Sequence, residues 1–207
     1  MGYPALAGEV RDVRVCFVGD SYVAGVGDAS GLGWAGRLTA HAHARGLPVT
    51  AYNLGIRRDT SSDVAARLPG EVDRRIHPAA ETRVVLAYGL NDVSLDDGRP
   101  RVDAAGSLAA TARSLRWLAS AHVPAIFLGP PAIGDAAQDS RTGNLDRLLA
   151  DCVASHGVTY LSLFKRLAGN PAWLEGVREG DGAHPGAAGY QQYFEAVRDP
   201  LMRFLAG

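Results

Sequence analysis

Five short apolar runs, separated by longer segments of helical character, constrain the fold of this chain more than any other feature. The runs span residues 13–18, 48–53, 83–88, 123–128 and 158–161. Most of them are nearly continuous rather than alternating, which is typical of strands covered on both faces. Because strands that alternate with helices form a parallel sheet with helices on both sides, we predict an α/β fold.

The segments between these runs carry apolar residues at intervals of three or four, which places them on one face of a helix. We predict a single domain over residues 1–207, because this length suits one core and no repeat or linker divides the chain. The apolar stripes are Trp34, Leu38 and Ala42; Val64, Leu68 and Val72; Leu108, Ala112, Leu115 and Ala119; Leu145, Leu148, Leu149 and Cys152; and Tyr190, Phe194, Val197 and Leu201.

Charge and hydropathy exclude several classes of partner. The formal net charge is -1 and the arginines are scattered, so nothing favours nucleic acid or an anionic membrane surface. No apolar run approaches the ~18 residues that a membrane span needs, so we expect no stable membrane insertion. Residues 1–10 lack the basic start and apolar core of a signal peptide, which predicts a cytoplasmic protein.

The cysteines and histidines do not predict a disulfide or a metal site. Cys16 lies in the first predicted strand and Cys152 on a helical apolar face, so we expect both to be free buried thiols. His41 and His43 are two residues apart and would point to different faces of a helix. We therefore expect no metal at these positions.

Residues suited to catalysis follow three of the predicted strands. Ser21 follows the first strand in a glycine-flanked turn, Gly55 follows the second strand, and Asn91 follows the third. Asp181 and His184 precede the last predicted helix. Since ligands of open parallel sheets bind beyond the carboxyl ends of the strands, we expect these residues to lie together at that edge.

These residue types are the ones that acyl transfer requires. A serine hydroxyl becomes a nucleophile when a base takes its proton, and the imidazole of His184 is suited to this. Asp181 would hold the other ring nitrogen and stabilise the imidazolium. The oxyanion of the tetrahedral intermediate would accept hydrogen bonds from Ser21 N–H, Gly55 N–H and the Asn91 side-chain amide.

At this point the chain resembles a known family, the SGNH hydrolases, also called GDSL esterases and lipases. The resemblance runs from about residue 13 to about residue 205 and implies a flavodoxin-like three-layer α/β/α fold with a five-stranded parallel sheet of order 2-1-3-4-5. It also implies an open site and hydrolysis of esters or thioesters without a cofactor. The segments that carry it are Gly19-Asp20-Ser21, Gly55, Gly89-Leu90-Asn91-Asp92 and Asp181-Gly182-Ala183-His184-Pro185.

The resemblance assigns the same roles as the chemistry does. It implies Ser21 as the nucleophile, His184 as the base and Asp181 as the acid that orients the base. It also implies Gly55 and Asn91 as oxyanion donors, together with the backbone of Ser21.

Other residues near these segments are expected to support the site or to line its pocket. Asp20 is adjacent to Ser21, but neighbours in a chain point apart, so we expect a structural role for it. Tyr22 stands where the family name has leucine and is a candidate for the substrate pocket. Trp173 either lines an acyl pocket or packs beneath the loop of His184. Two loops, residues 93–102 and 129–143, are expected to form the walls of the site.

The sequence favours a short-chain carboxylesterase that acts on a small-molecule ester through an acyl-enzyme. A sugar O-acetyl esterase is the next alternative, followed by a thioesterase or lysophospholipase, and the length of the pocket distinguishes them. Outside the hydrolases, the alternatives are an inactive binding protein and a nucleotide-binding α/β domain. The glycines between residues 25 and 33 do not have the spacing of a dinucleotide-binding loop.

Overall fold

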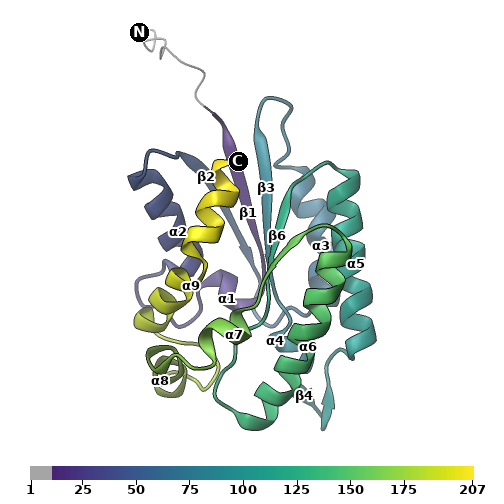
Figure 1. Cartoon of the computed structure of the whole chain (residues 1–207), viewed down its shortest axis with the longest axis vertical. Coiled ribbons are helices and arrows are strands. Elements are labelled where there is room, and N and C mark those ends of the chain that lie inside the picture. Colours follow the sequence, from purple (N-terminus) through teal and green to yellow (C-terminus); the bar gives the residue numbers. More distant parts are fainter. Residues whose placement is uncertain (1–10) are drawn as a thin grey trace.

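A five-stranded parallel sheet forms the centre of the molecule and has helices on both faces (Figure 1). The computed structural model describes residues 11–207. The spatial order of the strands is β2-β1-β3-β6-β7, which confirms the predicted order 2-1-3-4-5 when these strands are numbered along the chain. They are β1 (Val13–Gly19), β2 (Val49–Gly55), β3 (Glu81–Ala87), β6 (Ala125–Leu128) and β7 (Thr159–Leu161).

Alternate residues of β1 face two separate apolar layers. Val15 and Phe17 pack with α2 (Gly33–Ala44) and α9 (Ala187–Ala206). Cys16 and Val18 face the other layer, which contains α3 (Ser61–Asp73), α5 (Ala104–Ser120) and α6 (Ala136–Ser155). Because both faces of β1 are covered, its sequence is apolar almost throughout.

The short helices lie at the carboxyl edge of the sheet, which is the lower edge in Figure 1. Beyond the end of β1 the chain forms α1 (Ser21–Ala24), and beyond the end of β3 it forms α4 (Leu90–Val93). The chain between β7 and α9 forms α7 (Leu163–Leu167) and α8 (Pro171–Glu179). This edge therefore brings together the segments that the sequence singled out.

The two loops expected to form the site walls contain regular structure. Residues 93–102 include an antiparallel hairpin of β4 (Leu95–Asp96) and β5 (Arg99–Pro100). The second loop is shorter than predicted, because α6 begins at Ala136. Asp135 caps this helix by accepting a hydrogen bond from Gln138 N–H at 2.7 Å.

The stripe predicted for α5 is wrong in its direction. Only Leu115 of its four residues is buried, whereas Ser107, Thr111 and Ser114 are fully or almost fully buried. The hydroxyl groups find partners inside the protein, as in the bond from Tyr88 Oη to Thr111 Oγ1 at 3.2 Å. Apolar spacing alone does not reveal a buried helix face in which small hydroxyl residues with satisfied hydrogen bonds lie beside apolar ones.

Several other expectations concern thiols and location. Cys16 is buried and Cys152 is half-buried, and both are free.

Across residues 11–207, no helix combines the length and the apolar character that a membrane crossing needs. The expectation about a signal peptide concerns residues 1–10, which lie outside the described residues, and the cytoplasmic location stays a prediction.

Candidate active site

Ser21 is the first residue of α1, directly after the turn that ends β1. Asp20 caps this helix, because its Oδ1 accepts a hydrogen bond from Tyr22 N–H at 3.0 Å. A side chain at Gly19 would place its Cβ 1.9 Å from the carbonyl oxygen of Ala87, so only glycine allows β1 to approach β3 here. The N–H of Ser21 belongs to the first helical turn and has no acceptor among the described residues.

His184 connects Ser21 to Asp181 in one hydrogen-bonded chain. Nε2 of His184 lies 2.7 Å from Ser21 Oγ, and Nδ1 lies 2.8 Å from Asp181 Oδ2. The residues come from the start of α1 and from the loop between α8 and α9, 163 positions apart in the chain. The structure thus brings together the three residues that the sequence predicted as nucleophile, base and acid.

Asp181 is held in the form that suits this arrangement. Although partial burial raises its pKa, hydrogen bonds from the backbone N–H and ring of His184 and from Ala183 N–H outweigh this and lower the pKa to about 2. The backbone bonds are 2.7 Å from His184 and 3.0 Å from Ala183, both to Oδ1. Asp181 is therefore ionised at neutral pH and accepts the Nδ1–H of His184.

Tyr22 supports the loop that carries His184. Its hydroxyl group donates to the carbonyl oxygen of Ala183, and its ring centroid lies 5.4 Å from that of His184. Burial raises the pKa of Tyr22 well above its ordinary value, so the phenol stays protonated and remains a donor. The side chain is almost completely buried, and its visible role is to hold the loop.

Trp173 lies behind Tyr22 in the core. Its indole is fully buried, and Nε1 donates to the carbonyl oxygen of Ala132 at 2.7 Å. The ring centroids of Trp173 and Tyr22 are 6.0 Å apart. Of the two roles expected for Trp173, this position corresponds to packing beneath the loop rather than to lining an acyl pocket.

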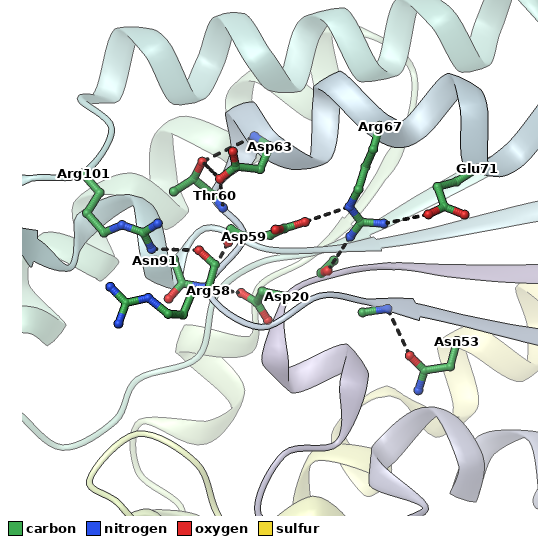
Figure 2. A network of polar contacts seen from close by, with 12 residues as sticks. Asp20, Asn53, Arg58, Asp59, Thr60, Asp63, Arg67, Glu71, Asn91 and Arg101 are labelled. Atoms are coloured by element: carbon green, nitrogen blue, oxygen red, sulfur yellow. Dashed lines mark hydrogen bonds and ion pairs between the residues drawn. The ribbon is translucent and has the colours of Figure 1, made fainter.

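Asn91 lies at the start of α4 and contacts the residue before the nucleophile. Its Nδ2 donates to the carbonyl oxygen of Asp59 at 2.9 Å and makes a longer contact of 3.4 Å with Asp20 Oδ2 (Figure 2). The side-chain amide is thus beside the Ser21 turn, where the sequence predicted an oxyanion donor. The contact with Asp59 is a good hydrogen bond, and the contact with Asp20 is weak.

Asp20 has surroundings unlike those of Asp181. Its burial raises its pKa to about 7, and the nearby carboxyl groups of Asp92 and Asp59 add to this, while the bond from Tyr22 N–H opposes it. Its carboxylate oxygens accept from Tyr22 N–H and from Asn91 Nδ2, and no hydrogen bond joins Asp20 to His184 in the described part of the chain. This agrees with the structural role expected for Asp20.

Gly55 does not present a free amide to this site. Its N–H donates to Asn53 Oδ1 at 3.1 Å, and a Cβ at Gly55 would lie 2.2 Å from Ala24 N. The glycine is therefore needed for the close packing of β2 against α1. Gly55 N–H was expected to be an oxyanion donor, but its hydrogen bond to Asn53 would have to break before it could bind the oxyanion.

Arg58 is a residue that sequence reasoning missed. Its φ is 69°, in the left-handed region that favours glycine, and its N–H has no acceptor among residues 11–207. Nothing in the sequence marks it, since an arginine three residues beyond a strand carries no pattern. It lies in the loop between β2 and α3, next to the Asp59 carbonyl that binds Asn91.

A network of charged side chains fixes this loop (Figure 2). Arg67 of α3 donates from Nε to Asp59 Oδ2 at 2.7 Å and from Nη2 to the carbonyl oxygen of Gly19 at 2.8 Å. Arg101 Nη1 donates to the carbonyl oxygen of Arg58 at 2.8 Å. The loop is thereby tied to β1 on one side and to the segment after the β4–β5 hairpin on the other.

Two clefts border the loop that carries Asp181 and His184. One has a volume of about 400 Å³ and includes Gly27, Asp181 and His184 in its walls. The other has about 670 Å³ and passes Gly182, with Leu174 as one of its apolar residues. The proposed base and its acid thus border the smaller of these two clefts.

Comparison with known proteins gives a consistent result. Residues 17–192 match the sequence profile of the GDSL-like Lipase/Acylhydrolase family. No curated protein sequence gave a significant match.

Solved structures of similar fold cover almost the whole chain. A lipase/acylhydrolase from Enterococcus faecalis has a TM-score of 0.76 and 23% identity, over 92% of this chain and 96% of that one. TesA has a TM-score of 0.73 and 21% identity, over 93% and 99%. Axe2, an acetylxylan esterase from Geobacillus stearothermophilus, has a TM-score of 0.73 and 17% identity, over 93% of each chain.

Proposed function

Because the chain belongs to the GDSL-like lipase/acylhydrolase family, and is thus a carboxylic ester hydrolase, we propose that it cleaves small esters through an acyl-enzyme on Ser21. The observation that carries this proposal is the hydrogen-bonded chain from Ser21 Oγ through His184 to Asp181, with distances of 2.7 and 2.8 Å. This geometry fits a nucleophile, a base and an orienting acid.

The proposed reaction has two halves. His184 Nε2 takes the hydroxyl proton while Ser21 Oγ attacks the ester carbonyl carbon, and the imidazolium then gives that proton to the leaving alcohol. In the second half, His184 takes a proton from water, the resulting hydroxide attacks the acyl-enzyme, and Ser21 Oγ regains the proton as the acid leaves. Asp181, held ionised, accepts the Nδ1–H throughout and keeps Nε2 directed at Ser21.

The tetrahedral oxyanion needs donors that are available in the resting site. We assign this role to Ser21 N–H and to the Asn91 side-chain amide, whose contact with Asp20 is only weak at 3.4 Å. Gly55, the third donor expected from sequence, would first have to release Asn53. The N–H of Arg58 has no acceptor among residues 11–207, and it precedes the Asp59 carbonyl that binds Asn91, so we propose it as a candidate for a third donor.

For the substrate we propose short-chain carboxylic esters, with sugar acetates as the second candidate. The cleft beside His184 can hold a small group, and one structure of similar fold is an acetylxylan esterase, which favours the second candidate. A thioesterase or lysophospholipase requires a longer apolar groove. Comparing p-nitrophenyl esters of increasing chain length, acetylated sugars and acyl thioesters would separate these activities.

Covalent labelling with a fluorophosphonate tests the nucleophile. We expect one adduct by intact mass, mapped to Ser21, and loss of both labelling and p-nitrophenyl acetate hydrolysis in Ser21→Ala and His184→Ala. Ser155→Ala, at the exposed end of α6, is the matched control and should label normally. An unlabelled wild-type protein would favour a binding protein or a nucleotide-binding domain, and comparable turnover by folded Ser21→Ala would refute the assignment.

A further inference from the structure

Arg58 holds a backbone conformation that residues with a side chain rarely adopt. Its φ of 69° lies in the left-handed region, where glycine would carry no penalty. Non-glycine residues in such conformations persist where the surrounding structure holds them, and they cluster at active sites and ligand clamps. The arginine side chain at this position therefore invites a functional explanation.

A second arginine fixes Arg58 in place. Arg101 Nη1 donates to the carbonyl oxygen of Arg58 at 2.8 Å, and Figure 2 shows both side chains on the same side of Asn91. Among residues 11–207, neither guanidinium forms an ion pair, whereas the neighbouring Arg67 pairs with Asp59 and Glu71. Arg58 is exposed and Arg101 is partly exposed, so an incoming ligand can reach them.

Three acidic side chains near the arginine pair (Arg58 and Arg101) are bound to other groups. Arg101 acts on two of them, but only at longer range than an ion pair. The three acids and their partners are Asp59 with Arg67, Asp63 with Thr60, and Asp92 with Ser61 and Ser107. The positive charge of the pair is therefore not neutralised by direct contact.

The pair also lies beside the proposed oxyanion donors. The carbonyl oxygen of Asp59, the residue after Arg58, accepts the hydrogen bond from Asn91 Nδ2 at 2.9 Å. Guanidinium groups bind carboxylates with two parallel hydrogen bonds, which combines charge with a defined geometry. On the basis of the proposed function, we propose that Arg58 and Arg101 bind an anionic group of the substrate, so that preferred esters carry a carboxylate near the scissile bond.

Two matched pairs of esters test this proposal and locate the charge. In the first pair, p-nitrophenyl butyrate is compared with mono-p-nitrophenyl succinate, whose acyl group ends in a carboxylate. In the second pair, phenyl acetate is compared with 4-acetoxybenzoate, whose leaving group carries the carboxylate. For one pair we expect kcat/KM to favour the anionic ester, after correction for the uncatalysed rates.

Variants of the pair should change this selectivity. Arg58→Gln and Arg101→Gln are each expected to lower the ratio of anionic to neutral kcat/KM by about five- to tenfold, the range of one charge-assisted hydrogen bond at a partly exposed site. Arg58→Lys should retain part of the ratio, because it keeps the charge but cannot form the two parallel hydrogen bonds. Arg116→Gln, an equal loss of charge on the exposed surface of α5, should leave the ratio unchanged.

The outcomes separate this inference from the proposed function. If neutral esters are hydrolysed and Ser21 is labelled, but neither anionic ester is preferred or the glutamine variants keep the wild-type ratio, the arginine pair does not bind substrate. If Ser21 is not labelled at all, the proposed function itself fails. Should a variant not fold, the wild-type preference must still fall in 1 M salt, where charges are screened beyond about 3 Å.

Discussion

Asp20 and Asp181 are the two carboxyl groups closest to the proposed chemistry, and their surroundings are opposite. Asp181 lies in a half-exposed loop and accepts three hydrogen bonds from Ala183 and His184. Asp20 is buried, accepts one good bond from Tyr22 and faces other carboxyl groups. The pKa falls to about 2 for Asp181 and rises to about 7 for Asp20.

The difference shows why adjacency in the chain is a poor guide to a catalytic role. Asp20 is next to Ser21, but its carboxyl group contacts the N-terminus of α1 and the side chain of Asn91. Asp181 is far away in sequence, yet it is ionised and bonded to the ring that contacts Ser21. An orienting acid has to be charged and in contact with the base, and only Asp181 meets both conditions.

The largest loss of activity is expected from a substitution of Asp181. Asp181→Asn should lower kcat by about 10³–10⁴-fold, because an amide stabilises neither the required tautomer nor the imidazolium. Steady-state hydrolysis of p-nitrophenyl acetate measures this, and Asp151→Asn on the exposed face of α6 is the control. A loss below tenfold would mean that Asp181 is not the orienting acid.

The Asn91 amide should have the next largest effect. Asn91→Ala removes a donor to the oxyanion and is expected to lower kcat by about 10²–10³-fold with little change in KM. Asn144→Ala, an exposed position on α6, serves as the matched control. An unchanged kcat in a folded Asn91→Ala protein would leave Asn91 with the structural contact to Asp59 alone.

Tyr22 tests whether the Asp181 loop needs support from the core. Tyr22→Phe deletes the hydrogen bond to Ala183 and should lower kcat by about threefold to tenfold, since the His184 ring loses a fixed position. The free energy of unfolding should fall by about 1 kcal/mol. Tyr52→Phe is the control, because the Tyr52 hydroxyl group forms no hydrogen bond among the described residues. Equal kcat and equal stability of the two variants would argue against this role of Tyr22.

Asp20 should affect turnover only a few-fold but should make stability depend on pH. A folded-state pKa of about 7 against an ordinary value of 3.8 means that the folded protein binds this proton more tightly than the unfolded chain. The contribution of Asp20 to the free energy of unfolding is therefore fully present below pH 3.8. As the pH rises toward 7, this contribution falls by about 1–4 kcal/mol.

Urea unfolding of the wild type and of Asp20→Asn between pH 4 and pH 8 measures this loss. The asparagine variant lacks the titrating group, so its stability relative to the wild type should rise with pH. A constant difference between the two proteins would show that Asp20 does not titrate with a raised pKa.

Much of the fold could be predicted because its signals are local. The apolar runs became β1, β2, β3, β6 and β7, and each strand boundary lies within two residues of the prediction. The stripe Val64, Leu68 and Val72 is fully buried. The α5 stripe failed because its buried face includes serine and threonine residues beside apolar ones, and two of their hydroxyl groups bond to side chains outside α5, those of Tyr88 and Asp92. Their burial depends on those contacts and not on spacing.

The candidate site divides in the same way. The residue types of Ser21, His184 and Asp181, at strand and helix ends, already specified a nucleophile, a base and an acid. The state of the amides of Gly55 and Arg58 depends on how the β2–α3 loop packs on α1 and on Arg101, and no spacing encodes that. Likewise, Trp173 and Tyr22 lie near the site residues in sequence, but only the folded structure shows that Trp173 packs behind Tyr22.

The sequence by itself determined the parallel sheet, the family and the chemical identity of the proposed catalytic residues. These follow from periodicity and residue type, which are properties of short segments. Tertiary structure alone decided which carboxyl group is ionised, which backbone amides lack an acceptor within residues 11–207, and where Arg101 meets Arg58. These properties depend on desolvation and on hydrogen bonds between distant segments, and they exist only once the chain has folded.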